Sequence, residues 1–313
     1  MPRFDVAVAG ELNLDLILYG LPEELPTERE FLARGLMVTL GSSSAILAHN
    51  LAALGARVAF ASLIGDDPLG EIALQRLAEA GVDISQVKKA KGRTTGLTVI
   101  LQHEGRRRIL TYAGTMAEMG PGDLDSKYLA SARHFHLSSY FLQPALRPHV
   151  AELFQKMKAA GLSTSLDTND DPEDRWQGVF DVLPNVDVFL PNEREALRLT
   201  GAASLESAVE QLGERVPVLA VKLGAQGALA RRGREEVRCQ AAQVTPVDPV
   251  GAGDSFDAGF LYQYVQGASL SACLRYGNLA GALSTSMAGG TEAFRDRPNV
   301  ERFFHEHAAG KRS

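Results

Sequence analysis

Several features that mark special classes of protein are scarce or missing in this 313-residue sequence. Its two cysteines, Cys239 and Cys273, are too few for a disulfide framework and lack the spacing of a metal site. No apolar run approaches the ~18 residues that a membrane-spanning helix needs. Residues 1–5 lead directly into a strand-like run, without the charged and then apolar regions of a signal peptide. We therefore expect a cytoplasmic protein with no membrane partner.

An excess of positive charge is also missing. Lys and Arg number 32 against 38 Asp and Glu, so the net charge is -6. Proteins that bind nucleic acid through its phosphates usually carry a basic excess. The sequence therefore predicts no nucleic-acid partner.

Two common nucleotide-binding motifs are absent as well. No Gly-x-x-x-x-Gly-Lys-Ser/Thr occurs, so a P-loop is not expected. A dehydrogenase that uses NAD would need Gly-x-Gly-x-x-Gly after the first strand, and Gly10-Glu11-Leu12-Asn13 does not match it. Any phosphate site must therefore be built in another way.

Strand-like and helix-like segments alternate along most of the chain. Residues 4–9 form a short apolar run typical of a buried parallel strand, and residues 43–54 carry apolar side chains at helical spacing. The alternation continues with strands at 58–64, 134–138, 163–167, 186–190 and 218–223 and helices at 68–80, 146–160, 192–199 and 269–287. It predicts a single α/β domain over 1–313, with a doubly wound, mostly parallel sheet covered by helices on both faces.

Two stretches, 14–39 and 94–113, depart from this alternation. Both read as pairs of strands without a helix between them, and the second has its turn at His103-Glu104-Gly105. So few strands cannot bury a core of their own. We expect them to form a small β-sheet lid over the main domain. Exposed strand edges on such a lid could also pair with a second copy and form a homodimer.

The most informative segment is Val247-Asp248-Pro249-Val250-Gly251-Ala252-Gly253-Asp254-Ser255-Phe256. Gly251, Ala252 and Gly253 leave backbone N–H groups uncovered just before a helix predicted to begin at Asp254. Free N–H groups and the helix dipole make such a terminus an anion site. A carboxylate would repel a resting phosphate, so Asp254 indicates chemistry: it could take a proton from a hydroxyl that attacks phosphorus. A helix-capping Asp after a glycine turn is the alternative.

The string Asp248–Asp254 closely resembles the C-terminal signature of the ribokinase-like (phosphofructokinase-B) carbohydrate kinase family. The resemblance implies a ribokinase-like fold and transfer of the γ-phosphoryl of ATP to a primary hydroxyl of a sugar, sugar acid, sugar phosphate or nucleoside. It also implies Mg²⁺ as a cofactor, Asp254 as the base, and Gly251, Ala252 and Gly253 as stabilisers of the transferring phosphoryl. A sugar- or nucleotide-binding regulator without activity is the alternative from another class.

Three further elements resemble the substrate-binding residues of the family. They are Asn13 and Asp15 after the first strand, Gly41, Ser42 and Ser43 before the first helix, and Asp167 and Asn169 after a later strand. An Asx turn is the alternative for Asn13 and Asp15, and a turn or helix-capping pair is the alternative for Asp167 and Asn169. Ser42 stands where the family has glycine, and Ile46 stands where it often has asparagine. The resemblance therefore names no particular substrate.

Asn192 and Glu195 resemble the Asn-x-x-Glu element that positions Mg²⁺ in the family, mostly through bound water. One carboxylate and one amide suit octahedral Mg²⁺, because this ion keeps several waters. The same spacing is also that of a helix capping box, and both interpretations can hold in one structure.

The residues that would bind ATP are implied by weaker resemblances to the family. Lys222, Gly224, Gly227 and Asn278 resemble residues that line ATP in the family, with an ordinary glycine hairpin and a structural asparagine as the alternatives. Asp248 resembles a ligand of the monovalent cation, K⁺, that some members bind.

Residues 106–108, all arginine, lie on the predicted lid hairpin. They could meet a phosphate or carboxylate of the substrate, although three arginines at a turn are usually solvated. Fructose, ribose, a ketodeoxy sugar acid, a nucleoside and a sugar phosphate all fit the motifs.

Overall fold

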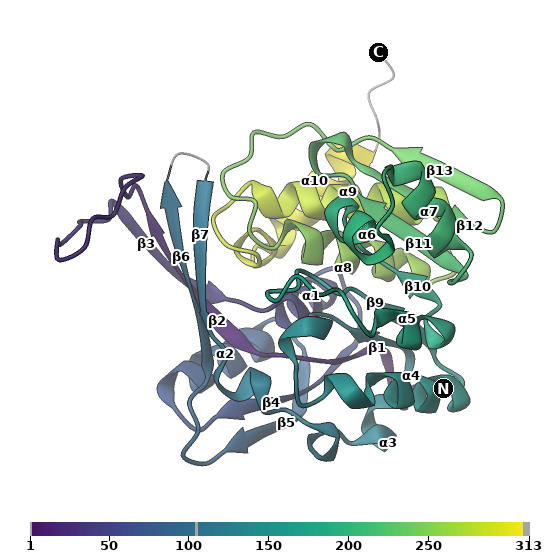
Figure 1. Ribbon diagram of the computed structural model, residues 1–313, viewed down its shortest axis with the longest axis horizontal. Helices are drawn as coiled ribbons and strands as arrows, with labels where there is room; N and C mark the ends of the chain where they lie inside the picture. Colours follow the sequence, from purple (N-terminus) through teal and green to yellow (C-terminus); the bar gives the residue numbers. More distant parts are fainter. Residues whose placement is uncertain (1, 104–105, 309–313) are drawn as a thin grey trace.

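A mostly parallel sheet runs through the computed structural model, which describes residues 2–103 and 106–308 (Figure 1). Within these residues the sheet has nine strands in the order β13-β12-β11-β10-β9-β8-β1-β4-β5. Only the pairs β11–β12 and β12–β13 are antiparallel. The strands are β1 Phe4–Ala9, β4 Val58–Gly65, β5 Asp83–Ala90, β8 Ala132–Leu137, β9 Ser163–Leu166, β10 Val188–Phe189, β11 Val218–Lys222, β12 Ala228–Arg232 and β13 Glu235–Cys239.

Helices cover both faces of this sheet, because a buried strand sends alternate side chains to opposite sides. In β1, Ala7 and Ala9 belong to one core cluster, whereas Val6 and Val8 belong to the other. The first cluster includes the helices α3 Ser126–Leu129, α4 Val150–Ala159, α5 Val179–Val182, α6 Glu193–Thr200 and α7 Leu205–Gly213. The second includes α1 Ser43–Ala53, α2 Pro68–Glu79, α8 Ala252–Tyr264 and α9 Leu270–Thr285. The predicted doubly wound α/β fold is confirmed.

The remaining helical segments are peripheral. Helix α10, Arg297–Ala308, packs with α9 in a smaller cluster. Short 3-10 helices lie at Gly114–Ala117, Pro121–Asp123, Tyr140–Leu142, Arg147–His149, Leu183–Asn185, Gly224–Gln226 and Glu292–Phe294. Across residues 2–103 and 106–308, none of the helices has the length and apolarity needed to cross a membrane.

The predicted lid is a separate four-stranded sheet in the order β3-β2-β6-β7, and it stands to one side of the main body (Figure 1). Its strands are β2 Asn13–Tyr19, β3 Gly35–Leu40, β6 Gly96–His103 and β7 Arg106–Tyr112. Strands β2 and β6 are parallel, and the outer pairs are antiparallel. The predicted turn between β6 and β7 includes residues 104–105, which lie outside the described residues.

The lid meets the body through a few buried apolar contacts. Leu14 and Leu40, at the base of the lid, belong to the core cluster beneath α1 and α8. Further out, Ile17 of β2 and Ile100 of β6 pack with Val250, which precedes α8. Because Val250 belongs to the predicted anion loop, the underside of the lid touches that loop directly.

Several elements differ from the sequence-based expectations. Helix α8 begins at Ala252 rather than at Asp254, because Gly251 adopts φ 72° and caps the helix two residues earlier. Asn13 and Asp15 lie on lid strand β2 rather than directly at the end of β1, because polar and apolar residues alternate over residues 13–16, as in a strand with one apolar face. Strand β10 is shorter than predicted, and β5 was not predicted, because its half-exposed residues lack an apolar run.

Candidate active site

The residues predicted to bind the substrate lie where the direction of winding reverses, whereas the predicted nucleotide residues lie on or after β11 and on α9. The chain runs from β1 to β4 and β5 on one side, and then to β8 and β9 on the other. Ligands of open α/β sheets bind beyond the carboxyl ends of the strands at such a reversal. The loops that follow β1, β8 and β9 all open there, and α8 begins nearby.

The N-terminus of α8 provides the predicted anion site. Gly251 caps the helix, and the N–H of Ser255 is the first to bond back, to the Gly251 carbonyl at 2.9 Å. The Ala252 N–H reaches the Pro249 carbonyl at 3.3 Å, so it is partly engaged. Within the described residues the N–H groups of Gly251, Gly253 and Asp254 have no acceptor. These three groups are free to bind an anion. The predicted role of the Ala252 N–H in the same site stays a prediction.

Position 251 of this loop requires glycine. Its φ of 72° is in the left-handed region, and a Cβ there would lie 2.5 Å from the Cα of Gly290. The same Cβ would lie 3.3 Å from the side chain of Ile46, which is buried. Ile46 therefore supports the anion loop by packing, and it does so at the position where the family often has a polar asparagine.

Asp254 lies in the first turn of α8 and is 9% exposed. Burial, together with the charge of Asp167, raises its pKa from 3.8 to about 6. Ser43 and the amide of Asn169, which approaches Asp254 to 3.5 Å, oppose this rise. A carboxylate with this pKa is ionised at neutral pH and still basic enough to accept a proton.

Asn13 and Asp15 face the site from the lid strand β2. Both pack against Gly41, where a Cβ would lie 2.2 Å from an oxygen of Asp15 and 2.7 Å from the Asn13 oxygen. Burial, with the charges of Asp254 and Asp248, raises the pKa of Asp15 to about 7. The Asn13 amide nitrogen donates to Thr98 at 3.2 Å, but its buried oxygen has no hydrogen-bond partner in the described residues. That oxygen is a place for a hydroxyl donor of a ligand.

The loop before α1 connects these residues to the anion site. Ser42 caps α1, since its side chain accepts from the Ala45 N–H at 3.4 Å, and its hydroxyl donates to the Glu11 carbonyl at 2.8 Å. It adopts φ 64°, a conformation that glycine adopts without strain. This explains physically why glycine suits the position, and two hydrogen bonds offset the strain of serine. Ser43, in the first turn of α1, faces Asp254.

Asp167 is fully buried beneath the site and forms an ion pair there. The ammonium of Lys222, at the end of β11, contacts Asp167 at 2.7 Å and Asp257 of α8 at 3.1 Å. Burial opposes ionisation of Asp167, but Lys222 holds its pKa below the ordinary value. Burial and the Asp167 charge raise the pKa of Asp257 well above its ordinary value, although Lys222 opposes them. The trio therefore places two carboxyl groups against one ammonium group in the core.

This trio changes the interpretation of Lys222. Its side chain is engaged by carboxylates, so it is neither a solvated surface lysine nor a free cation for nucleotide phosphates. Lys222 also lies next to the helix terminus, because a Cβ on Gly253 would be 3.7 Å from its nitrogen. The ion pair thus supports the first turn of α8 from below. Asn169 lies above it, and its side-chain oxygen accepts from the Ser139 N–H at 2.8 Å.

Asn192 and Glu195 form the capping box that their spacing allows. Asn192 accepts from the Glu195 N–H at 2.9 Å, and Glu195 accepts from the Asn192 N–H at 2.8 Å. Burial and the charge of Asp167 raise the pKa of Glu195 to about 8. A cation beside Glu195 would favour its ionised form, so the pair fits an ion that binds largely through water. The described residues contain no cluster of three or more acidic, His or Cys side chains that could hold a metal directly.

Two of the remaining residues predicted to bind the nucleotide, Gly227 and Asn278, contact the backbone at the end of β13. Gly227 adopts φ 90°, and a Cβ there would lie 2.0 Å from the Cys239 carbonyl. Asn278 donates to the carbonyls of Cys239 and Gln240 at 2.9 and 3.1 Å. Both residues therefore hold the end of β13, and Gly224 lies in the 3-10 turn after β11. These contacts agree with the structural role that was the alternative for Asn278.

Asp248 is buried at the opposite end of the anion loop. One oxygen accepts from the Val250 N–H at 3.0 Å. The other accepts from the Tyr19 hydroxyl at 3.0 Å and from the Gly289 N–H at 3.2 Å. The carboxylate thus joins the lid, the anion loop and the segment after α9.

Glu11 and Asp257 are site residues that the motifs did not predict. The carboxylate of Glu11, buried directly after β1, accepts from the Ser44 hydroxyl at 2.6 Å and the Ser44 N–H at 3.2 Å, and Gln143 approaches it to 3.5 Å. Burial raises its pKa to about 7. A charged residue immediately after a buried strand, inside the Gly10–Asp15 motif, was the available signal for Glu11.

Comparisons with known proteins agree with this geometry. Residues 3–297 match the model of the family described as "pfkB family carbohydrate kinase". An ATP-dependent ribose-1-phosphate kinase from Halopiger xanaduensis is 30% identical over 294 residues, which are 92% of this chain and 94% of the relative.

Solved structures extend the comparison. A putative ribokinase II from E. coli in complex with ATP and Mg²⁺ has a TM-score of 0.86 at 25% identity, covering 97% of this chain and 100% of that one. An adenosine kinase from Sinorhizobium meliloti has a TM-score of 0.82 at 27% identity, covering 92% and 95%. The chain therefore belongs to the pfkB family of carbohydrate kinases, which are phosphotransferases.

Proposed function

We propose that this protein transfers the γ-phosphoryl group of ATP to a primary hydroxyl of a sugar or sugar-like substrate. The observation that carries the proposal is Asp254, a buried carboxylate with a pKa of about 6 in the first turn of a helix whose N–H groups are free. A base and an anion site lie within one turn of helix, which is what in-line phosphoryl transfer requires.

Each group has a separate task in this reaction. Asp254 accepts the proton of the attacking hydroxyl, while the N–H groups of Gly251 and Gly253 stabilise charge on the transferring phosphoryl. Asn13 and Asp15 orient the sugar from the lid, because the free oxygen of Asn13 can accept a hydroxyl hydrogen. Together they align the acceptor with the phosphoryl group, and alignment supplies much of the rate.

Mg²⁺ is the proposed metal, and when bound it neutralises charge on the phosphates. Asn192 and Glu195 would hold it through water, since the two side chains already form the capping box. The structure of the relative from E. coli in complex with ATP and Mg²⁺ supports the choice of metal. Binding of K⁺ beside Asp248 stays a prediction, which comparison of rates in potassium and choline chloride would test.

Removal of the base tests the proposed reaction. Asp254→Asn should lower kcat by roughly 10²–10⁴-fold with a responsive sugar, because the hydroxyl loses its proton acceptor. ATP binding and the far-UV spectrum should stay unchanged, and the exposed control Asp66→Asn should keep full activity. A kcat within a few-fold of wild type in Asp254→Asn would exclude this role.

Two other functions are separable by the same assay. A nucleoside kinase would release ADP with adenosine or cytidine and not with sugars, and the adenosine kinase from Sinorhizobium meliloti is a relative of that kind. A binding protein without activity would release ADP with no member of the panel. The intact Asp254 and the paired Asn192 and Glu195 favour an active kinase over a regulator.

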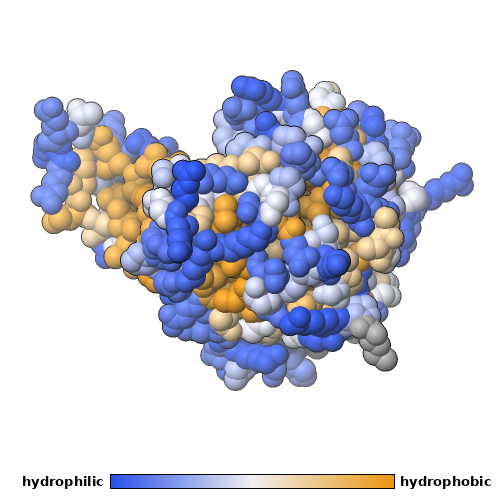
Figure 2. Space-filling model, turned by 90° about the horizontal axis from the view of Figure 1, so that it is seen from below, coloured by the Kyte–Doolittle hydropathy of each residue, from blue (hydrophilic) through white to orange (hydrophobic). Residues whose placement is uncertain are grey.

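A homodimer through the lid is the proposed assembly. The face of the lid that points away from Asp15 is aliphatic, and its Leu36 and Leu110 are 64% and 57% exposed. Figure 2 shows hydrophobic side chains gathered on this part of the molecule. Arg108 and Tyr112 lie on the same face, and its aliphatic residues are Leu16, Leu18, Leu36, Val38, Val99, Leu101 and Leu110. Sedimentation should give a dimer for the wild type and a monomer for Leu36→Glu with Leu110→Glu, because charges cannot be buried in such a face.

A further inference from the structure

The lid carries one arginine whose position implies a chemical class of substrate. We propose that Arg107 binds an anionic group, a carboxylate or a phosphate, on the sugar that Asp254 deprotonates. This inference rests on the proposed function and deepens it, because it distinguishes sugar acids and sugar phosphates from neutral sugars.

The strand register places Arg107 on the face of the lid that looks into the site. Asp15 pairs with Thr98, and Thr98 pairs with Thr111, so these three residues share that face. The hydroxyls of Thr98 and Thr111 approach each other to 3.3 Å, which agrees with the register. Arg107 lies four residues from Thr111 along β7, and side chains an even number of residues apart share a face. Arg107 is therefore on the same side as Asp15.

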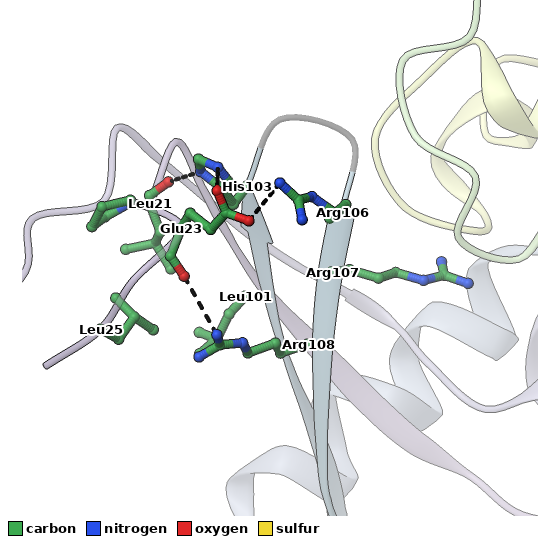
Figure 3. A pocket seen from close by; sticks show the side chains of 9 residues that line it. Leu21, Glu23, Leu25, Leu101, His103, Arg106, Arg107 and Arg108 are labelled. Atoms are coloured by element: carbon green, nitrogen blue, oxygen red, sulfur yellow. Dashed lines mark hydrogen bonds and ion pairs between the residues drawn. The ribbon is translucent and has the colours of Figure 1, made fainter.

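Its two neighbours project to the opposite side and are engaged there (Figure 3). Arg106 forms an ion pair with Glu23 at 2.5 Å, and Arg108 donates to the Glu23 carbonyl at 3.4 Å. Glu23 also lies 3.9 Å from His103. In Figure 3 the side chain of Arg107 extends away from this group, toward the main body. Arg107 is exposed and has no hydrogen-bond or ion-pair partner among the described residues.

The surroundings of Arg107 explain why such a cation is needed. Asp15 and Asp254 both face the sugar site, and their negative charges would repel an anionic substrate. Lys222 cannot compensate, because Asp167 and Asp257 already engage it. Arg107 lies close enough to Asp15 to lower the pKa of that carboxyl against the effect of burial. It is thus the free cation that the lid contributes to an acidic site.

The distances suit a sugar that spans the two ends of the lid. Four residues of strand separate the level of Asp15 from Arg107, roughly 13 Å at about 3.3 Å per residue. The long side chain of Arg107 shortens this span. A sugar held at Asp15 by its hydroxyls can therefore offer an acidic substituent at its far end. A guanidinium binds carboxylate or phosphate through two parallel N–H groups, which a neutral sugar cannot use.

The experiment compares three kinds of substrate in three proteins. Fructose and ribose are the neutral sugars, 2-keto-3-deoxygluconate is the sugar acid, and fructose 6-phosphate and ribose 1-phosphate are the sugar phosphates. Wild type, Arg107→Gln and the control Arg108→Gln are assayed for kcat/KM by ADP release. Calorimetry without nucleotide gives the Kd of each sugar, so that binding is measured independently of turnover.

We expect the wild type to prefer an anionic sugar, and the carboxylate and phosphate arms identify which anion. Arg107→Gln should weaken binding and kcat/KM for that sugar by roughly 10- to 100-fold, the usual loss for a charged hydrogen bond. Values for neutral sugars should change less than threefold, kcat at saturation should be nearly unchanged, and Arg108→Gln should behave as wild type.

Other results would overturn the inference in distinct ways. A wild type that binds and phosphorylates only neutral sugars would refute the role of Arg107 while leaving the proposed kinase intact. An equal loss for anionic and neutral sugars in Arg107→Gln would indicate a general role in catalysis or lid structure instead. Binding of an anionic sugar that depends on Arg107, without any ADP release, would support the inference and refute the proposed function.

Discussion

The hydroxyl of Tyr19 donates a hydrogen bond to the Asp248 carboxylate at 3.0 Å, and this bond ties the lid strand β2 to the loop that precedes α8. Asp248 also accepts the Val250 N–H, so the carboxylate that orders the anion loop is the one that anchors the lid. Burial and the negative charge of Asp248 raise the pKa of Tyr19 far above its usual range, so the hydroxyl remains a donor. The position of the lid and the shape of the anion site are therefore coupled.

Tyr19→Phe should loosen the lid. Loss of a hydrogen bond to a charged group costs about 1.5–3 kcal/mol, and here this loss falls on the contact between lid and body. Amide exchange in residues 13–19 and 35–40 should become faster in the free protein, as measured by mass spectrometry. The control is Tyr112→Phe, since Tyr112 lies on the same sheet but is 60% exposed. Equal exchange in both variants would refute the coupling.

Binding of a true substrate should slow amide exchange in the same lid strands and in residues 96–112. The lid has little core of its own, so closure over the sugar adds contacts that it otherwise lacks. ATP alone should change these rates much less, because the residues predicted to contact the nucleotide belong to the main body and none of them lies on the lid strands. Uniform protection of the whole chain on sugar binding would refute a closing lid.

The pH dependence follows from Asp254. Its pKa is raised from 3.8 to about 6, so it must lose its proton before it can act as a base. kcat/KM should fall tenfold per pH unit below about pH 6 and level off above about pH 7. A pH–rate profile checks this, and a flat profile down to pH 5 would contradict the assignment.

Ionisation of Asp254 should also lower the free energy of unfolding of the protein. A carboxyl whose folded pKa is raised binds its proton more tightly in the folded state, so stability falls as pH rises between the unfolded and folded pKa values. Asp254→Asn has no charge to bury, and a rise of the pKa from 3.8 to about 6 corresponds to at most ~3 kcal/mol. The variant should therefore unfold at higher denaturant than wild type at pH 8 and at equal denaturant below pH 4. Equal stability at both pH values would contradict the raised pKa.

Glu195→Gln separates the two roles of the Asn192–Glu195 pair. If Glu195 positions Mg²⁺, the Mg²⁺ concentration for half-maximal rate should rise, because an amide attracts the hydrated ion less than a carboxylate does. A pure capping role predicts only a stability loss of about 0.5–2 kcal/mol. Rates measured over a Mg²⁺ series, together with thermal unfolding, distinguish these outcomes. An unchanged Mg²⁺ dependence would exclude the metal role.

Lys222→Met should destabilise the protein by about 3–5 kcal/mol, because it leaves the buried charge of Asp167 without a partner. The matched control is Lys158→Met, whose ion pair with Asp187 at 2.6 Å is partly exposed and should be worth about 1 kcal/mol or less. Denaturant unfolding measures both. Adding Asp167→Asn to Lys222→Met should recover part of the loss, and equal losses in the two lysine variants would contradict the buried trio.

The sequence was sufficient for the fold class and for locating the loop and helix terminus on which the proposed site is built. Alternating apolar runs and helical periodicities are local patterns, and each one follows from the chain's own geometry. They were enough to predict the parallel sheet, the two-part lid and the helix after Gly251. The motif that contains Asp254 is local in the same sense, because the proposed base and the N–H groups of the anion site lie within residues 251–254. The pairing of Asn192 with Glu195 was predictable for the same reason.

Only the tertiary structure decided which distant groups compensate one another. Lys222 meets Asp167 and Asp257 across 55 and 35 residues of sequence, so its burial could not be inferred from its neighbours along the chain. The same holds for the Tyr19 bond to Asp248, which joins residues 229 positions apart. Local patterns specify backbone geometry and the face that a side chain takes, whereas partners of charged groups depend on how the elements pack. Burial and pairing then determine the pKa values of the site carboxyl groups, such as that of Asp254. They also leave Arg107 without a hydrogen-bond or ion-pair partner among the described residues.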